Sequence, residues 1–131
     1  MEDLKRNFDV VPAVNQVEWN PKSRDFDLLK YCKDNKIVLQ GYSSLGSSED
    51  ASLRVDETVK KIAADLGKSP SQVLLRWATQ NEIAVIPKAT LKQHLQENFN
   101  LNFVIPEAEM KVLNGFTQRV KSSSWDPNNV I

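Results

Sequence analysis

Three short apolar runs in this chain each end in side chains suited to contact a ligand. The side chains at the three ends are Asn15 and Gln16, Tyr42 and Ser43, and Lys88, Ala89 and Thr90. The first end offers amides, the second an aromatic face with a hydroxyl, and the third a cation. Amides and an aromatic face can hold a planar carboxamide ring, and a cation pairs with a phosphate. Because ligands of α/β proteins lie beyond the carboxyl ends of the strands, this combination favours a nucleotide cofactor.

The third end has the local pattern of a phosphate-binding junction. The β-branched run that precedes Lys88 predicts a buried strand, which a proline then ends. Thr90 and Gln93 have the spacing of a capping box and predict a helix over 91–99 with Thr90 as its N-cap. The positive end of a helix dipole beside a lysine favours an anion. A lysine after a strand is more often a solvated loop residue, so this junction alone does not establish a phosphate site.

Composition excludes several classes of function. The chain has 131 residues, enough for one domain over 1–131, and its 17 basic and 17 acidic residues leave no net charge. This balance argues against a nucleic-acid partner. The single Cys32 and the single His94 allow no internal disulfide and give no metal-ligand spacing. The polar first residues do not resemble a signal peptide, and no apolar run could span a membrane. We therefore expect a cytoplasmic protein without a metal.

The elements that position the three ends alternate along the chain. Val10 to Glu18 predicts a strand whose apolar half comes first, and Ser23 is placed to cap the helix that follows and stops near 33–35. A second strand is predicted over 37–42, and a serine-rich and glycine-rich loop over 43–52.

The second half of the chain is predicted to be mainly helical. An apolar stripe predicts a helix that Gly67 ends, and it consists of Val55, Val59, Ile62 and Leu66. Ser69 is a suitable N-cap for the next helix, with Pro70 at the first position and Gln72 completing a capping box. The third strand begins at residue 83, a last helix opens at 106–107, and the tail from residue 120 is predicted to be irregular.

Strands that alternate with helices predict an α/β fold with a parallel sheet and right-handed crossovers. Only three strands are predicted, and a three-stranded parallel sheet has two open edges. Those edges favour self-association or contact with another chain.

Four segments of the sequence together resemble the C-terminal portion of an aldo-keto reductase. They are 12–21 (PAVNQVEWNP), 41–47 (GYSSLGS), 86–90 (IPKAT) and 97–99 (ENF). The order and spacing of these segments match those of the family over nearly the whole chain. The resemblance implies a partial (β/α)₈ barrel of the TIM type, in which this chain forms roughly the last three strand–helix units and an irregular C-terminal loop.

The resemblance also implies roles for single residues in binding NADP. Gln16 matches the glutamine that holds the nicotinamide carboxamide, and Tyr42 matches the tyrosine that stacks under the ring. Lys88 matches the lysine that pairs with the adenosine 2′-phosphate. The remaining matches are Ser43, Leu45 and Ser47 in the loop over the pyrophosphate, Ala89, Thr90 and His94 near the 2′-phosphate, and Glu97 and Asn98 at the adenine.

The chain departs from the family pattern at several places. Ala89 replaces a serine that many members have and lacks its hydroxyl. His94 replaces an arginine, and an imidazole can stack on adenine but cannot make the bidentate bond of a guanidinium. The choice between NADP and NAD is therefore open. No residue matches the family's catalytic aspartate, tyrosine, lysine or histidine, so no catalytic residue is assigned. Trp19 and Trp125 are candidates for a substrate pocket.

Three functions follow as hypotheses. In the first, the chain forms the NADPH-binding part of a carbonyl reductase, with weak or absent binding in isolation and a carbonyl substrate only when the missing half is supplied. In the second, it is a truncated, non-catalytic paralogue that oligomerises or binds a partner through its open edges. A helix-turn-helix spacing over 62–73 gives the third, DNA binding, against which the zero net charge argues.

Overall fold

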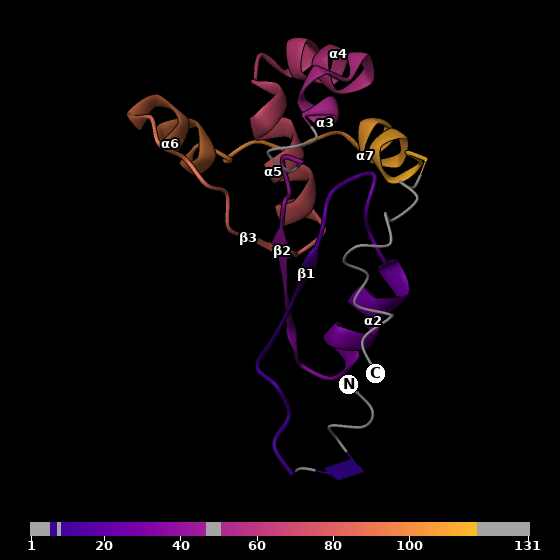
Figure 1. Cartoon of the computed structure of the whole chain (residues 1–131). Coiled ribbons are helices and arrows are strands. Elements are labelled where there is room, and N and C mark those ends of the chain that lie inside the picture. The colour runs from indigo at the N-terminus through magenta and orange to yellow at the C-terminus, as the bar shows by residue number, and fades with distance from the viewer. Residues whose placement is uncertain (1–5, 8, 47–50, 118–131) are drawn as a thin grey trace.

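The computed structural model describes residues 6–7, 9–46 and 51–117. Three strands and six helices alternate along these residues (Figure 1). Their bounds are β1 (Val14–Glu18), α2 (Phe26–Asp34), β2 (Val38–Tyr42), α3 (Ser52–Val55), α4 (Glu57–Leu66), α5 (Pro70–Gln80), β3 (Ala84–Val85), α6 (Lys92–Phe99) and α7 (Glu107–Asn114). None of the described helices is long and apolar enough to cross a lipid bilayer.

The strands form one parallel sheet in the order β1-β2-β3. Val14 pairs with Val38 and Glu18 with Tyr42, while Gln40 begins the short pairing with β3 at Ala84. Three parallel strands with flanking helices confirm the predicted α/β class and partial barrel. No further strand pairs with the outer edge of β1 or β3 in the described part of the chain.

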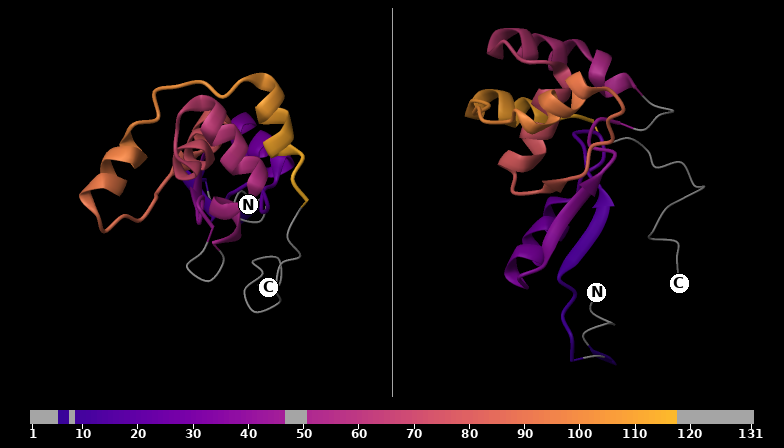
Figure 2. Two further views of the ribbon diagram at one scale, coloured as in Figure 1. Left: turned by 90° about the horizontal axis from the view of Figure 1, so that it is seen from above. Right: turned by 90° about the vertical axis from the view of Figure 1, so that its left-hand side faces the viewer.

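One face of the sheet is open. Because side chains alternate along a strand, residues 14, 16 and 18 share a face with residues 38, 40 and 42. On that face Val14 is 48% exposed and Val38 is 52% exposed, whereas Leu39 on the opposite face is buried. Figures 1 and 2 show that α2 lies beside β1 and β2, while α3, α4 and α5 gather at the end of the strands.

The core is centred on Trp77 of α5. Its ring stacks on Trp19 with a centroid distance of 6.2 Å, and Trp19 meets the edge of Phe26 at 5.7 Å. The Trp77 indole Nε1 donates to Asn114 Oδ1 at 2.7 Å. Trp19 and Trp77 are both fully buried. One aromatic pair thus links the end of β1 to α5 and, through the amide, to α7.

The predicted ends of α4 and α5 are confirmed. Gly67 ends α4 with a φ of 62°, in the left-handed region that favours glycine. Ser69 caps α5, Pro70 takes the first turn, and Gln72 completes the capping box. These signals act over three or four residues and therefore need no tertiary information.

Three local predictions in the first half of the chain were wrong. Strand β1 begins at Val14 rather than near Val10, because pairing with β2 starts where the Val38 N–H donates to the carbonyl of residue 13. Ser23 does not cap α2, because its backbone pairs with that of residue 20; Asp25 accepts from the Leu28 N–H instead, at 2.9 Å.

The third wrong prediction concerns the helix before Gly67. Asp56 caps α4 by accepting from the Thr58 N–H at 2.9 Å, so the predicted helix is divided into α3 and α4. Val55 is consequently 58% exposed, whereas Val59 and Ile62 are buried.

We predict that Gly41→Ala destabilises the fold. A Cβ at this buried strand position would lie 2.7 Å from Trp19 Cβ and 3.2 Å from Ile83 Cγ2. The resulting strain should lower the free energy of unfolding by about 1–3 kcal/mol, measured by urea titration. Gly115→Ala is the control, because Gly115 has a φ of −89° and its nearest new contact is 3.3 Å. Equal stability of Gly41→Ala and the wild type would contradict the packing described.

Candidate functional site

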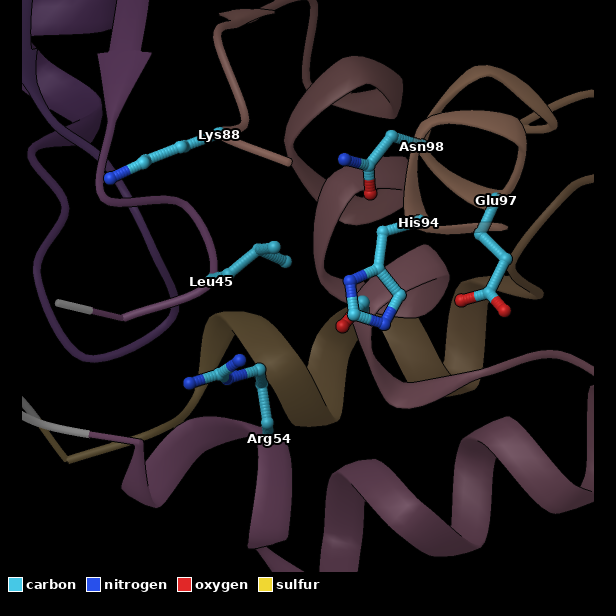
Figure 3. A pocket seen from close by; sticks show the side chains of 7 residues that line it. Leu45, Arg54, Lys88, His94, Glu97 and Asn98 are labelled. Carbon is cyan, nitrogen blue, oxygen red and sulfur yellow. The ribbon is translucent and has the colours of Figure 1, made fainter. Parts of the chain in front are cut away.

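A pocket of about 110 Å³ lies where the loop after β2, α3, α5, the segment after β3 and α6 meet (Figure 3). Its lining residues are Leu45, Arg54, Ser71, Lys88, His94, Glu97 and Asn98. Five of these seven were assigned cofactor contacts from the sequence, and the structure brings those five together. Arg54 and Ser71 were not predicted.

Helix α6 presents three of the lining residues. His94, Glu97 and Asn98 are spaced by three and four residues, so they share one helical face. No side chain of α6 is buried, and Figures 1 and 2 show this helix standing apart from the others. Apolar packing therefore does not hold α6 in place.

Gln72 of α5 holds the end of α6 through hydrogen bonds. Its side-chain Nε2 donates to the Asn100 carbonyl at 3.0 Å and to the Glu97 carbonyl at 3.4 Å. Its Oε1 accepts from the Ser69 N–H at 3.0 Å. The residue that completes the capping box of α5 thus also positions the helix that carries one wall of the pocket.

The pocket carries an excess of positive charge. It is lined by the Lys88 ammonium and the Arg54 guanidinium, against the single carboxylate of Glu97. That carboxylate accepts from Gln93 Nε2 at 3.0 Å. Among the residues that the structure describes, neither cation forms an ion pair. A pocket with this balance attracts an anion.

A turn after β2 brings Leu45 to the pocket. Ser43 has a φ of 51°, and the buried Asn20 holds it by donating from Nδ2 to the Ser43 carbonyl at 3.1 Å. Ser44 Oγ donates to the Gly41 carbonyl at 3.2 Å. In the view of Figure 3, Leu45 lies between the Lys88 and Arg54 side chains.

Gln16 and Tyr42 form a second group on the open face of the sheet. Gln16 lies within β1 rather than at its end, because the strand runs on to Glu18, and its Nε2 donates to Gln40 Oε1 at 2.6 Å. Tyr42 ends β2 on the same face and is 36% exposed. An amide and a partly exposed aromatic ring therefore lie on one surface of the sheet.

Thr90 does not cap α6. The N-cap is Leu91, whose backbone is extended, and no side chain bonds to the helix there. The helix begins one residue later than predicted, which places His94 rather than Gln93 at its third position. Thr90 is exposed and Ala89 half-buried beside Lys88, and neither lines the pocket.

The two substrate-pocket predictions have different outcomes. Trp19 is fully buried in the core against Trp77, so its side chain offers no surface to a substrate. The position just after a strand suggested a pocket wall, but packing on α5 turns the ring inward. Trp125, together with Ser47 of the predicted pyrophosphate loop, lies outside the described residues.

Arg54 could not be found by sequence reasoning. It lies on the four-residue α3, whose last residue, Val55, begins the apolar stripe that predicts one continuous helix up to Gly67. The break at Asp56 changes which side chains face the pocket. Within the described ranges, no cluster of three or more histidine, cysteine or acidic side chains could hold a metal.

Comparison with known proteins places the chain in an enzyme family. The sequence model of the Aldo/keto reductase family matches residues 1–117. The chain is 36% identical to the 9,11-endoperoxide prostaglandin H2 reductase of Trypanosoma cruzi, over 98% of this chain and 46% of that protein. It is 33% identical to the NAD(P)H-dependent D-xylose reductase of Kluyveromyces lactis, over 96% and 43%.

Solved structures give the same result. An aldo-keto reductase from a Medee basin deep-sea metagenome library matches with a TM-score of 0.84 and 32% identity, over 94% of this chain and 47% of that one. A mutant of Gox0644 in complex with NADPH matches with a TM-score of 0.88 and 29% identity, over 99% and 47%. The chain spans about half the length of the curated relatives it matches.

We predict that Gln72→Ala loosens α6. The substitution removes the donor to the Asn100 carbonyl and one partner of the α5 capping box, so it should cost about 1–2 kcal/mol of unfolding free energy. Hydrogen exchange of the α6 amides should accelerate. Gln80→Ala is the matched control, because Gln80 bonds to the Ile105 backbone instead. Unchanged exchange in α6, or the same acceleration in both variants, would contradict this role.

Proposed function

Because the chain belongs to the aldo/keto reductase family, we propose that it forms the NADP(H)-binding C-terminal part of a carbonyl reductase. The single observation that supports this proposal most is the pocket that joins Leu45, Lys88, His94, Glu97 and Asn98. The resemblance assigns Leu45 to the pyrophosphate and the other four to the adenosine part of the same cofactor, and the five come from three separate parts of the sequence.

In this proposal the chain binds the cofactor at two places. Lys88 pairs with the adenosine 2′-phosphate, while Glu97 and Asn98 contact the adenine. Tyr42 stacks under the nicotinamide, and Gln16 exchanges its bond to Gln40 for one to the carboxamide. When bound, the cofactor supplies a hydride for the reduction of a carbonyl to an alcohol.

The chain's own residues are proposed to orient and hold the cofactor rather than to donate the proton. No residue of the sequence matches the acid of the family, so a carbonyl substrate requires the part of the barrel that this chain does not supply. An open sheet face does not preorganise the nicotinamide end, so binding should be weak or absent in isolation. The cytoplasmic location expected from the sequence stays a prediction.

The open face of the sheet favours a second candidate function, that of an interaction or oligomerising protein. Val14 and Val38 are about half exposed there, next to an edge of β1 that has no strand partner among the described residues. Exposed parallel edges promote pairing with another chain. Light scattering that shows a compact monomer at high concentration would count against this function.

The cofactor proposal predicts that Lys88→Met weakens NADP⁺ binding. Calorimetry would be run on the chain alone and mixed with the N-terminal half of a family member. We expect saturable binding that tightens in the mixture, and a loss of about tenfold in the variant because a charge-assisted contact is removed. Lys92→Met is the control, since Lys92 lies nearby on α6 but does not line the pocket. Absence of NADP⁺ binding in the mixture would refute the proposal.

A further inference from the structure

Arg54 is the one fully ionised group of the pocket that nothing in the sequence assigned. We propose that Arg54 binds the adenosine 2′-phosphate together with Lys88 and so determines the preference of this chain for a phosphorylated cofactor. This inference rests on the proposed function and deepens it. It gives the phosphate a second cation from α3, an element that was not predicted.

The side chain is presented to the pocket by a short, anchored helix. Leu53 buries one side of α3 in the core with 2% of its surface exposed, and Arg54 follows it on the outer side. Lys22 ties both ends of the helix, with Nζ 3.1 Å from Ser52 Oγ and 4.0 Å from Asp56 Oδ2. Figure 3 shows the Arg54 side chain rising from α3 toward Leu45.

The acidic groups near Arg54 that the structure describes are engaged elsewhere. Asp56 accepts from the Thr58 N–H at the start of α4 and faces Lys22. Glu97, the carboxylate of the pocket, accepts from Gln93. Among the described residues, no carboxylate within ion-pair distance neutralises the guanidinium. Two cations that share a pocket without a counter-ion repel each other, and a dianionic phosphate relieves that repulsion.

The Arg54 guanidinium can form the pair of hydrogen bonds to a phosphate that the His94 imidazole cannot form. An imidazole cannot make two parallel hydrogen bonds to a phosphate, whereas a guanidinium can. His94 and Arg54 line the same pocket from α6 and α3. In many family members one arginine both stacks on the adenine and binds the 2′-phosphate. In this proposal the two tasks are divided, because His94 stacks on the adenine and Arg54 binds the phosphate.

The test uses two small probes that occupy only the adenosine end. Adenosine 2′,5′-bisphosphate carries the 2′-phosphate, and adenosine 5′-monophosphate lacks it. All lining residues of the pocket belong to this chain, so the probes do not require the other half of a barrel. Calorimetry on the full chain should show a clear preference for the bisphosphate.

We predict that Arg54→Gln lowers affinity for the bisphosphate by about tenfold and changes affinity for the monophosphate less than twofold. Arg54→Lys should recover part of the loss, because it keeps the charge but not the bidentate bond. Lys92→Gln is the matched control and should bind both probes as the wild type does. Arg54 is exposed, and circular dichroism should confirm that the variants remain folded.

The outcomes separate this inference from the proposed function. If Arg54→Gln binds the bisphosphate normally while Lys88→Gln does not, Arg54 plays no part and the cofactor proposal stands. Equal losses for both probes would place Arg54 at another part of the nucleotide and overturn the inference. If the wild type binds neither probe, the inference is overturned, while the proposed function is decided separately by NADP⁺ binding in the mixture with the N-terminal half of a family member.

Discussion

The rest of the structure depends on the burial of Trp77. Its ring stacks on Trp19 at the end of β1, and its indole N–H bonds to Asn114 at the end of α7. Around it, α5 is buried along most of its length, and the Ala78 carbonyl accepts from the Ile83 N–H at 3.0 Å just before β3. Because α5 is buried on several sides, it fixes the positions of strand ends that are far apart in sequence. The pocket forms where those strand ends come together.

The pocket itself is held less firmly than the core. Its α6 wall has no buried side chain and is attached to α5 through Gln72, whereas its α3 wall is anchored by Leu53 and Lys22. A bound phosphate would contact both α3 and α6 and so connect the two walls of the pocket. We therefore expect a ligand to stabilise the position of α6. Under the proposed function, the adenosine site is built from residues of this chain alone, while the nicotinamide site lies on an open sheet face.

Local signals made part of this architecture predictable. The caps at Ser69 and Gly67 and the parallel order of strands follow from spacing and residue type. The start of β1 does not follow from spacing and residue type, because a strand begins where a partner strand pairs with it rather than where apolar residues are densest. The buried position of Trp19 and the position of Arg54 at the pocket depend on how α5 and α3 pack, and that packing is not encoded in any local pattern.

The central claim is that one pocket of this chain binds the adenosine end of NADP(H). The most direct measurement is an amide chemical-shift titration with NADP⁺ of the isotope-labelled chain mixed with the unlabelled N-terminal half of a family member, followed residue by residue. The account predicts saturable shifts that centre on Leu45, Arg54, Lys88 and the helix α6, with small changes at α2 and α7. Shifts confined to the open face around Val14 and Val38, or no saturable shifts at the pocket, would contradict it.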